Sequence, residues 1–125
     1  MSSSDINFDH EQNLVHVRVF GQDEGNDREQ RMVSVISSPD WRPGYNVIVQ
    51  FFDPQVHVNT ADALRAAAFV DSYSELFKGS TIVVVNPHHN TAHVGEALSA
   101  AHAIKGLTNL HRVASLKEAY AIVGG

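Results

Sequence analysis

The sequence of 125 residues contains no cysteine, which excludes disulfides, thiolate nucleophiles and metal sites built on cysteine ligands. No apolar run approaches the roughly 20 residues that a membrane-spanning helix requires. The polar start, MSSSDINFDHEQ, has no apolar segment of the kind found in secretory signals. We therefore expect a cytoplasmic protein without a transmembrane segment.

Several enzyme motifs are also missing. The chain has no Gly-x-Ser-x-Gly elbow, no Gly-x-Gly-x-x-Gly and no Walker-type phosphate loop. A histidine beside a carboxylate can titrate close to neutrality, so His57 with Asp53 would suit acid/base chemistry. Nothing in their spacing favours that use over solvent exposure. We expect a non-catalytic protein without a cofactor, and a small enzyme with histidine or carboxylate chemistry is the last-ranked alternative.

Positive charge is scarce, and the net charge of −5 is unevenly distributed. Residues 1–29 hold seven acids and two arginines, whereas the seven acids of the remaining chain are balanced by seven bases. Because no basic face is available to release counterions from a phosphate backbone, we do not expect nucleic acid as a partner. An anionic membrane surface is disfavoured for the same reason.

The composition is that of an ordinary folded protein, with 43 % hydrophobic and 18 % charged residues. The length fits a single domain, residues 1–125, with a real hydrophobic core. Apolar and polar residues alternate over residues 6–9 and 15–20, which predicts a β-hairpin with one buried face. A helix ending near Ser37 should follow. Its inner side should be formed by Met32, Val33 and Ile36, and Trp41 should pack beneath the start of the next strand.

Two nearly continuous apolar runs, residues 47–52 and 81–85, are typical of strands covered on both faces of a mainly parallel sheet. Apolar residues at helical spacing follow each run and predict helices that stop at Gly79 and at Gly106. A short strand is expected at residues 110–113. A last helix should open on the capping box Ser115 to Glu118. Its apolar face should hold Leu116, Ala119, Tyr120 and Val123.

These elements predict an α/β fold with a single mixed, mainly parallel sheet, an N-terminal β-hairpin and helices packed on the sheet. The order ββαβαβαβα, the length and the polar loop between a central strand and a helix resemble the STAS domain of anti-sigma-factor antagonists and sulfate-transporter tails. More narrowly, WRPGYNVIVQFFD and LFKGSTIVVVNP resemble small stand-alone bacterial proteins grouped as SpoIIAA-like or lipid-binding-like. Most of those proteins have no assigned activity.

The STAS resemblance implies a phosphorylation switch, because a kinase modifies a serine at a helix start in the antagonists. With Gln50 in the place of the strand carboxylate, Thr60 takes the place of that serine and Asn59 of its neighbour. A phosphate there would be stabilised by free N–H groups and the helix dipole. However, Asp62 would repel the phosphate, and helix capping alone also explains an Asn-Thr pair. The motif positions that depart from the family are Gln50, Val58, Ala61 and Asp62.

The first hypothesis for function is therefore a regulatory or protein-interaction module. Because the carboxyl ends of parallel strands meet at one edge of a sheet, the loops after the two central strands should form one binding surface. The partner would be a protein, such as a kinase or an anti-sigma-like regulator. The residues of this surface would be Asp53, His57, Asn59, Thr60, Asp62, Asn90 and Thr91.

Two further interpretations concern ligands. Four phenylalanines could line a pocket for a lipid or another small apolar ligand, although the core is their ordinary place. His89 and His93 stand four residues apart, a spacing compatible with a metal site together with His57 and Asp53, but we expect no metal. The histidine cluster considered for metal binding is His88, His89 and His93. The phenylalanines considered for the pocket are Phe51, Phe52, Phe69 and Phe77. The sequence does not decide whether the chain forms a homodimer through an edge strand or an exposed helix.

Overall fold

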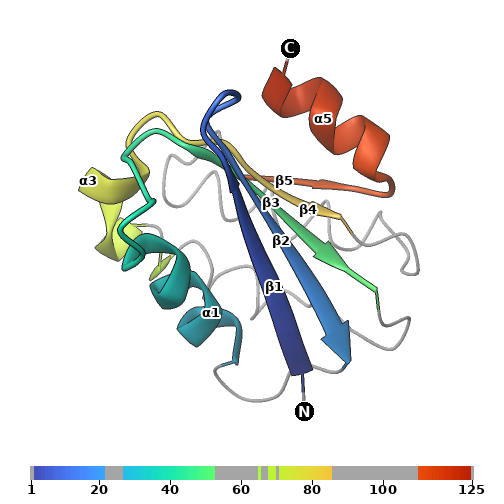
Figure 1. Ribbon diagram of the computed structural model, residues 1–125, viewed down its shortest axis with the longest axis horizontal. Helices are drawn as coiled ribbons and strands as arrows, with labels where there is room; N and C mark the ends of the chain where they lie inside the picture. The colour runs from blue at the N-terminus through green and yellow to red at the C-terminus, as the bar shows by residue number, and fades with distance from the viewer. Residues whose placement is uncertain are drawn as a thin grey trace.

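The computed structural model describes residues 2–21, 27–52, 65, 68–69, 71–85 and 110–124 (Figure 1). In these residues the fold is α/β with a single mixed sheet, as predicted. The elements, in chain order, are β1 (Ser2–Asp9), β2 (Leu14–Gly21), α1 (Asp27–Ile36), β3 (Asn46–Phe51), α3 (Ser74–Phe77), β4 (Ile82–Val85), β5 (Leu110–Val113) and α5 (Leu116–Gly124).

The described strands form a five-stranded sheet in the order β1-β2-β3-β4-β5. β1 and β2 are antiparallel, and each later pair is parallel. The predicted hairpin and the strands at residues 47–52, 81–85 and 110–113 are therefore confirmed. The predicted helix up to Gly106 lies outside the described residues. The helix before Gly79 is described in part, with helical backbone at residues 65, 68–69 and 71–72 ahead of α3.

A tight polar turn closes the hairpin. The Asp9 carboxylate accepts hydrogen bonds from the backbone N–H groups of Glu11 and Gln12, at 3.1 and 3.2 Å. Asn13 has a φ of 54°, a left-handed conformation that asparagine tolerates better than most residues. Its carbonyl then accepts a hydrogen bond of 2.9 Å from the N–H of Asn46, which joins the turn to the start of β3.

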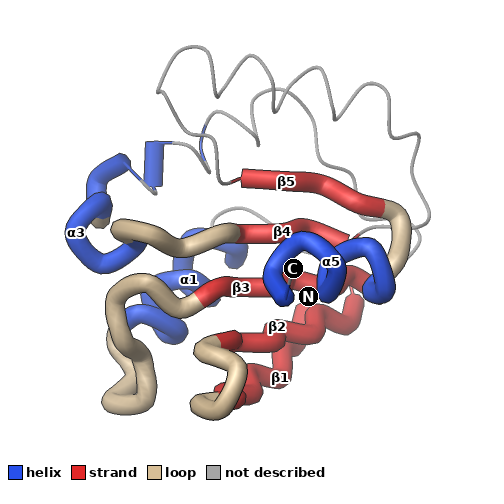
Figure 2. Tube along the Cα trace, turned by 90° about the horizontal axis from the view of Figure 1, so that it is seen from above, coloured by secondary structure: helices blue, strands red, loops and turns tan. Residues whose placement is uncertain are grey.

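Both faces of the sheet are covered, as expected for central parallel strands. α1 and α3 lie on one face, here called the first face, and α5 lies on the other, the second face (Figures 1 and 2). The core of the first face includes Val15, Val17, Val19, Val47, Val49, Trp41 and Phe77. The core of the second face consists of Leu14, Ile48, Val83, Val85 and Ala119. Among the described residues, no helix is long and apolar enough to cross a bilayer.

The inner side of α1 differs from the prediction. Val33 is 40 % exposed, whereas Arg31 and Val35 are buried beside Ile36. The helix thus presents positions 31, 32, 35 and 36 to the sheet, a stripe from which residue 33 is rotated away. Arg31 can occupy this stripe because its aliphatic stem packs in the core while its guanidinium carbon lies 6.0 Å from the centre of the Phe51 ring.

The start of α5 shows half of the predicted capping box. Ser115 Oγ accepts a hydrogen bond of 3.2 Å from the N–H of Glu118, as expected. The Glu118 carboxylate, however, accepts a hydrogen bond from the N–H of Ala114 rather than from that of Ser115. Ala119 is buried, but Tyr120 was expected on the same face and is exposed. Its ring instead forms a T-shaped pair with the His16 ring, with the centroids 6.4 Å apart.

The side chain of Asn46 joins three elements at the start of β3. Its Oδ1 accepts a hydrogen bond of 2.8 Å from the N–H of Thr81, before β4, and its Nδ2 donates to the carbonyl of Val123 in α5 at 3.4 Å. We predict that Asn46→Ala lowers the free energy of unfolding by about 1–2 kcal/mol, because it leaves part-buried backbone groups unsatisfied. Urea denaturation checks this. Asn7→Ala on exposed β1 is the control, and an equal loss in both variants would contradict the prediction.

Candidate functional site at the carboxyl edge of the sheet

The two central parallel strands end at the same edge of the sheet. β3 and β4 are neighbours, and Gln50 of β3 pairs with Val85, the last residue of β4. Val19 of β2 pairs with Phe51, so β2 ends there too. We call this side of the sheet, where β2, β3 and β4 end, the carboxyl edge. Polypeptide leaving β3 and β4 therefore starts from one edge, as predicted, and this is where parallel α/β sheets commonly bind ligands.

The residues predicted for the binding surface cannot be compared with the structure, because all of them lie outside the described residues. They are Asp53, His57, Asn59, Thr60, Asp62, Asn90 and Thr91. The histidines considered for a metal site, His88, His89 and His93, lie outside them as well. In the part of the chain that is described, no group of three or more side chains is arranged to hold a metal ion.

Two phenylalanine rings lie exposed at the carboxyl edge. Phe20 near the end of β2 and Phe52 just after β3 stack with their centroids 4.9 Å apart and their planes at 13°. The pairing of Val19 with Phe51 and a hydrogen bond of 3.0 Å from the N–H of Phe52 to the carbonyl of Val19 hold the rings side by side. Each residue is 41 % exposed. This edge therefore presents a preformed apolar contact on its second face.

The first face of the same edge carries arginine side chains against a buried ring. The guanidinium carbons of Arg28 and Arg31 lie 5.7 and 6.0 Å from the centre of the Phe51 ring. Both distances fall within the range of cation–π attraction. α1 brings the arginines to this edge because the helix follows β2 and packs on the first face. Positive charge therefore lies close to the strand ends, in a chain whose net charge is negative.

Gln50, which the STAS resemblance would place at the strand carboxylate, faces the second side of the sheet. His16 Nε2 forms a hydrogen bond of 2.9 Å with the side-chain amide of Gln50. Arg18, the ladder partner of Gln50 on β2, forms an ion pair with Asp5 of β1. This second-face surface is polar between the core under α5 and the stacked phenylalanines.

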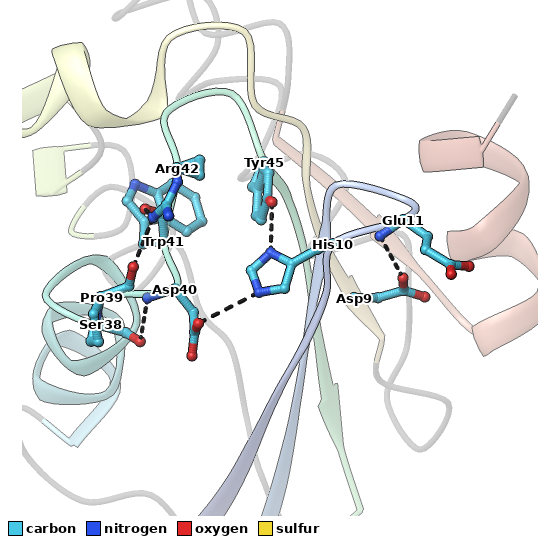
Figure 3. Close-up of polar contacts among 9 residues, drawn as sticks. All are labelled: Asp9, His10, Glu11, Ser38, Pro39, Asp40, Trp41, Arg42 and Tyr45. Atoms are coloured by element: carbon cyan, nitrogen blue, oxygen red, sulfur yellow. Dashed lines mark hydrogen bonds and ion pairs between the residues drawn. The ribbon is translucent and has the colours of Figure 1, made fainter.

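A second polar cluster lies at the opposite edge, where β3 begins (Figure 3). His10 Nδ1 forms a hydrogen bond of 2.7 Å with the hydroxyl of Tyr45, and His10 Nε2 lies 3.5 Å from Asp40 Oδ1. The ring of Tyr45 also contacts Trp41, which is buried as predicted and packs on Phe77. The cluster thus fastens the hairpin turn to the segment before β3, and half-exposed side chains of His10 and Asp40 place it at the surface.

A groove of about 630 Å³ lies on the first-face side, between α1 and the segment that holds Phe69, Ser72 and Tyr73. Its lining residues are Glu29, Gln30, Val33, Phe69, Ser72 and Tyr73. Of the four phenylalanines considered for a ligand pocket, Phe69 alone lines this groove, since Phe51 and Phe77 are buried in the core and Phe52 is exposed at the carboxyl edge. The four rings therefore do not form one pocket.

Comparisons with known proteins add no family to this picture. No protein-family model matches the sequence, and no curated protein matches it. The candidate site therefore rests on two structural observations: the common edge of β2, β3 and β4, and the stacked phenylalanines at that edge.

Proposed function

We propose that the chain is a non-catalytic, cytoplasmic protein-interaction or regulatory module of the STAS-like, SpoIIAA-like type, and that its partner protein binds at the carboxyl edge. The stacked pair of Phe20 and Phe52 is the observation that carries this proposal. Exposed aromatic rings are enriched among the residues that dominate binding energy at protein interfaces. Because these two rings are already held against each other, their immobilisation costs little on binding.

The proposal includes the full order ββαβαβαβα. Helical backbone at residues 65, 68–69 and 71–72 between β3 and β4 supports the second helix of that order. β4 and β5 are parallel, and a parallel pair needs a crossover of a dozen or more residues, usually a helix. Residues 86–109 provide a connection of sufficient length. A helix there agrees with the apolar face of Val94, Leu98, Ala101 and Ile104.

Site-specific photo-crosslinking tests the proposed binding edge. A benzoylphenylalanine introduced in place of Phe52 should crosslink a partner from a lysate of the source organism. The same probe in place of His10, half-exposed at the opposite edge, should not. A partner that crosslinks from position 10 but not from position 52 would refute binding at the carboxyl edge. Purification of the crosslinked protein then supplies the partner for direct titrations.

A phosphorylation switch at Thr60 belongs to the same proposal. Thr60→Asp imitates the negative charge of a phosphate at the binding surface. We predict that it weakens partner binding by about tenfold, because an unfavourable charge at an interface costs on the order of 1 kcal/mol or more. Thr60→Ser keeps the hydroxyl and should leave the affinity unchanged. Isothermal titration calorimetry with the purified partner measures both. Equal affinities for Thr60→Asp and the wild type would remove the switch while leaving the binding edge intact.

A second candidate function is the binding of a small ligand. The observation that favours it is the groove beside Phe69, whose volume of about 630 Å³ lies within the usual size of small-molecule sites, roughly 300–1,000 Å³. This groove is formed by helices and not by the strand ends.

A further inference from the structure

The groove between α1 and the segment that holds Phe69, Ser72 and Tyr73 exposes apolar side chains to solvent. Val33 and Tyr73 line it and are each 40 % exposed. The rings of Phe69 and Tyr73 lie beside each other, with centroids 4.8 Å apart and planes inclined at 42°. Two aromatic rings and a branched aliphatic side chain therefore line one open volume, and this arrangement suits a small flat or aliphatic body.

One carboxylate lines the groove. Arg65 holds the Glu29 side chain by donating from Nε at 3.0 Å and from Nη2 at 2.7 Å, and both bonds end on the single oxygen Oε1. Within the described residues, no hydrogen bond reaches Glu29 Oε2. The ion pair thus fixes the carboxylate in place and engages one of its two oxygens, Oε1.

The charges around the groove favour a cation. Glu29 is the only charged side chain among the described lining residues, and neither Arg28 nor Arg31 lines it. Aromatic rings such as those of Phe69 and Tyr73 also attract a positive charge that lies over their faces. The carboxylate and the aromatic rings of the lining therefore both favour a positively charged ligand.

We propose that this groove binds a small organic cation with an apolar body, of the arylalkylammonium class. The body lies against Val33, Phe69 and Tyr73, and the ammonium group donates to Glu29 Oε2. The carboxamide of Gln30 lines the same groove and offers a second polar contact. This site is separate from the carboxyl edge, so its existence does not depend on a protein partner.

Three probes of similar size separate charge from simple apolar binding. 2-Phenylethylammonium, phenylacetate and 2-phenylethanol are titrated into isotopically labelled protein, and the resonances of Gln30, Val33, Ser72 and Tyr73 are followed by NMR. We expect saturable shifts at these residues, with the dissociation constant of the ammonium at least about fivefold lower than that of the carboxylate, the ratio expected from one cation–π contact and one exposed ionic contact. Equal or tighter binding of phenylacetate or 2-phenylethanol would overturn the proposal.

Two variants locate the site. Val33→Trp fills the groove and should abolish the shifts, whereas Ile122→Trp, the matched change at a residue 38 % exposed on α5, should leave the affinity unchanged. Glu29→Gln removes the carboxylate but keeps Arg65, so the preference should reverse toward phenylacetate. NMR spectra of each variant without probe show whether it is folded. The absence of saturable binding in the wild type, saturable shifts confined to other residues, or unchanged binding in folded Val33→Trp would each overturn the proposal.

Discussion

Ile48→Ala should lower the free energy of unfolding by about 3–4 kcal/mol, within the range measured for large-to-small changes in protein cores. Ile48 is fully buried in the middle of β3, where the sheet packs beneath α5. Val83 on β4 pairs directly with it, and Ala119 of α5 belongs to the same cluster. The truncation removes apolar contacts and leaves a cavity that a central strand, held on both sides by ladder hydrogen bonds, cannot close.

The control for this prediction is the same chemical change at a different place. Ile122→Ala lies on α5 at a residue 38 % exposed, and we expect a loss below about 0.5 kcal/mol. Urea denaturation followed by the fluorescence of the single tryptophan, Trp41, measures both variants, because that side chain is buried in the first-face core. Similar losses for the two variants would show that α5 does not cover this part of the sheet.

Replacing both stacked phenylalanines, Phe20→Ser with Phe52→Ser, should weaken partner binding by about a hundredfold or more. Central aromatic residues of an interface commonly contribute 2 kcal/mol or more each, and about 2.7 kcal/mol corresponds to a hundredfold change in affinity. Both rings are already partly exposed, so the loss of folding stability should be much smaller than the effect on binding. Calorimetric titration of the purified partner measures the affinity, and thermal unfolding measures the stability.

Tyr120→Ser provides the matched control for the double variant. Tyr120 is 40 % exposed and is also aromatic, but it lies on α5 rather than on the strand ends. Its replacement should leave the affinity within about twofold of the wild type, as for a residue outside the energetically important centre of an interface. If the phenylalanine variant and the wild type bound the partner equally well, the stacked pair would have no part in recognition.

Much of the sheet could be predicted because its signals are local. Alternating residues defined the hairpin, and the apolar runs at 47–52 and 81–85 defined two strands whose burial requires helices on both faces. The common edge of β3 and β4 followed from that burial, since parallel strands end on the same side. The start of α5 could also be predicted, because the capping residue Ser115 and the residue that it caps, Glu118, are close in sequence.

What could not be predicted depends on contacts between distant residues. The stacking of Phe20 on Phe52 follows from the register between β2 and β3, which no local pattern specifies. The hydrogen bond between His10 and Tyr45 joins residues 35 positions apart. The burial of Arg31 in place of Val33 was missed because a hydrophobicity pattern gives no weight to an arginine stem. The predicted site residues at 53–62 and 90–91 lie outside the described chain and stay predictions.

Hydrogen–deuterium exchange of the chain, alone and saturated with its partner, tests the binding edge most directly. We predict that the partner slows exchange in the peptides that contain Gly21 and Phe52, at the ends of β2 and β3. Exchange in the turn at residues 10–13 and in the segment 38–45, at the opposite edge, should be unchanged. Slowed exchange restricted to those two segments, with none at Gly21 or Phe52, would contradict recognition at the carboxyl edge.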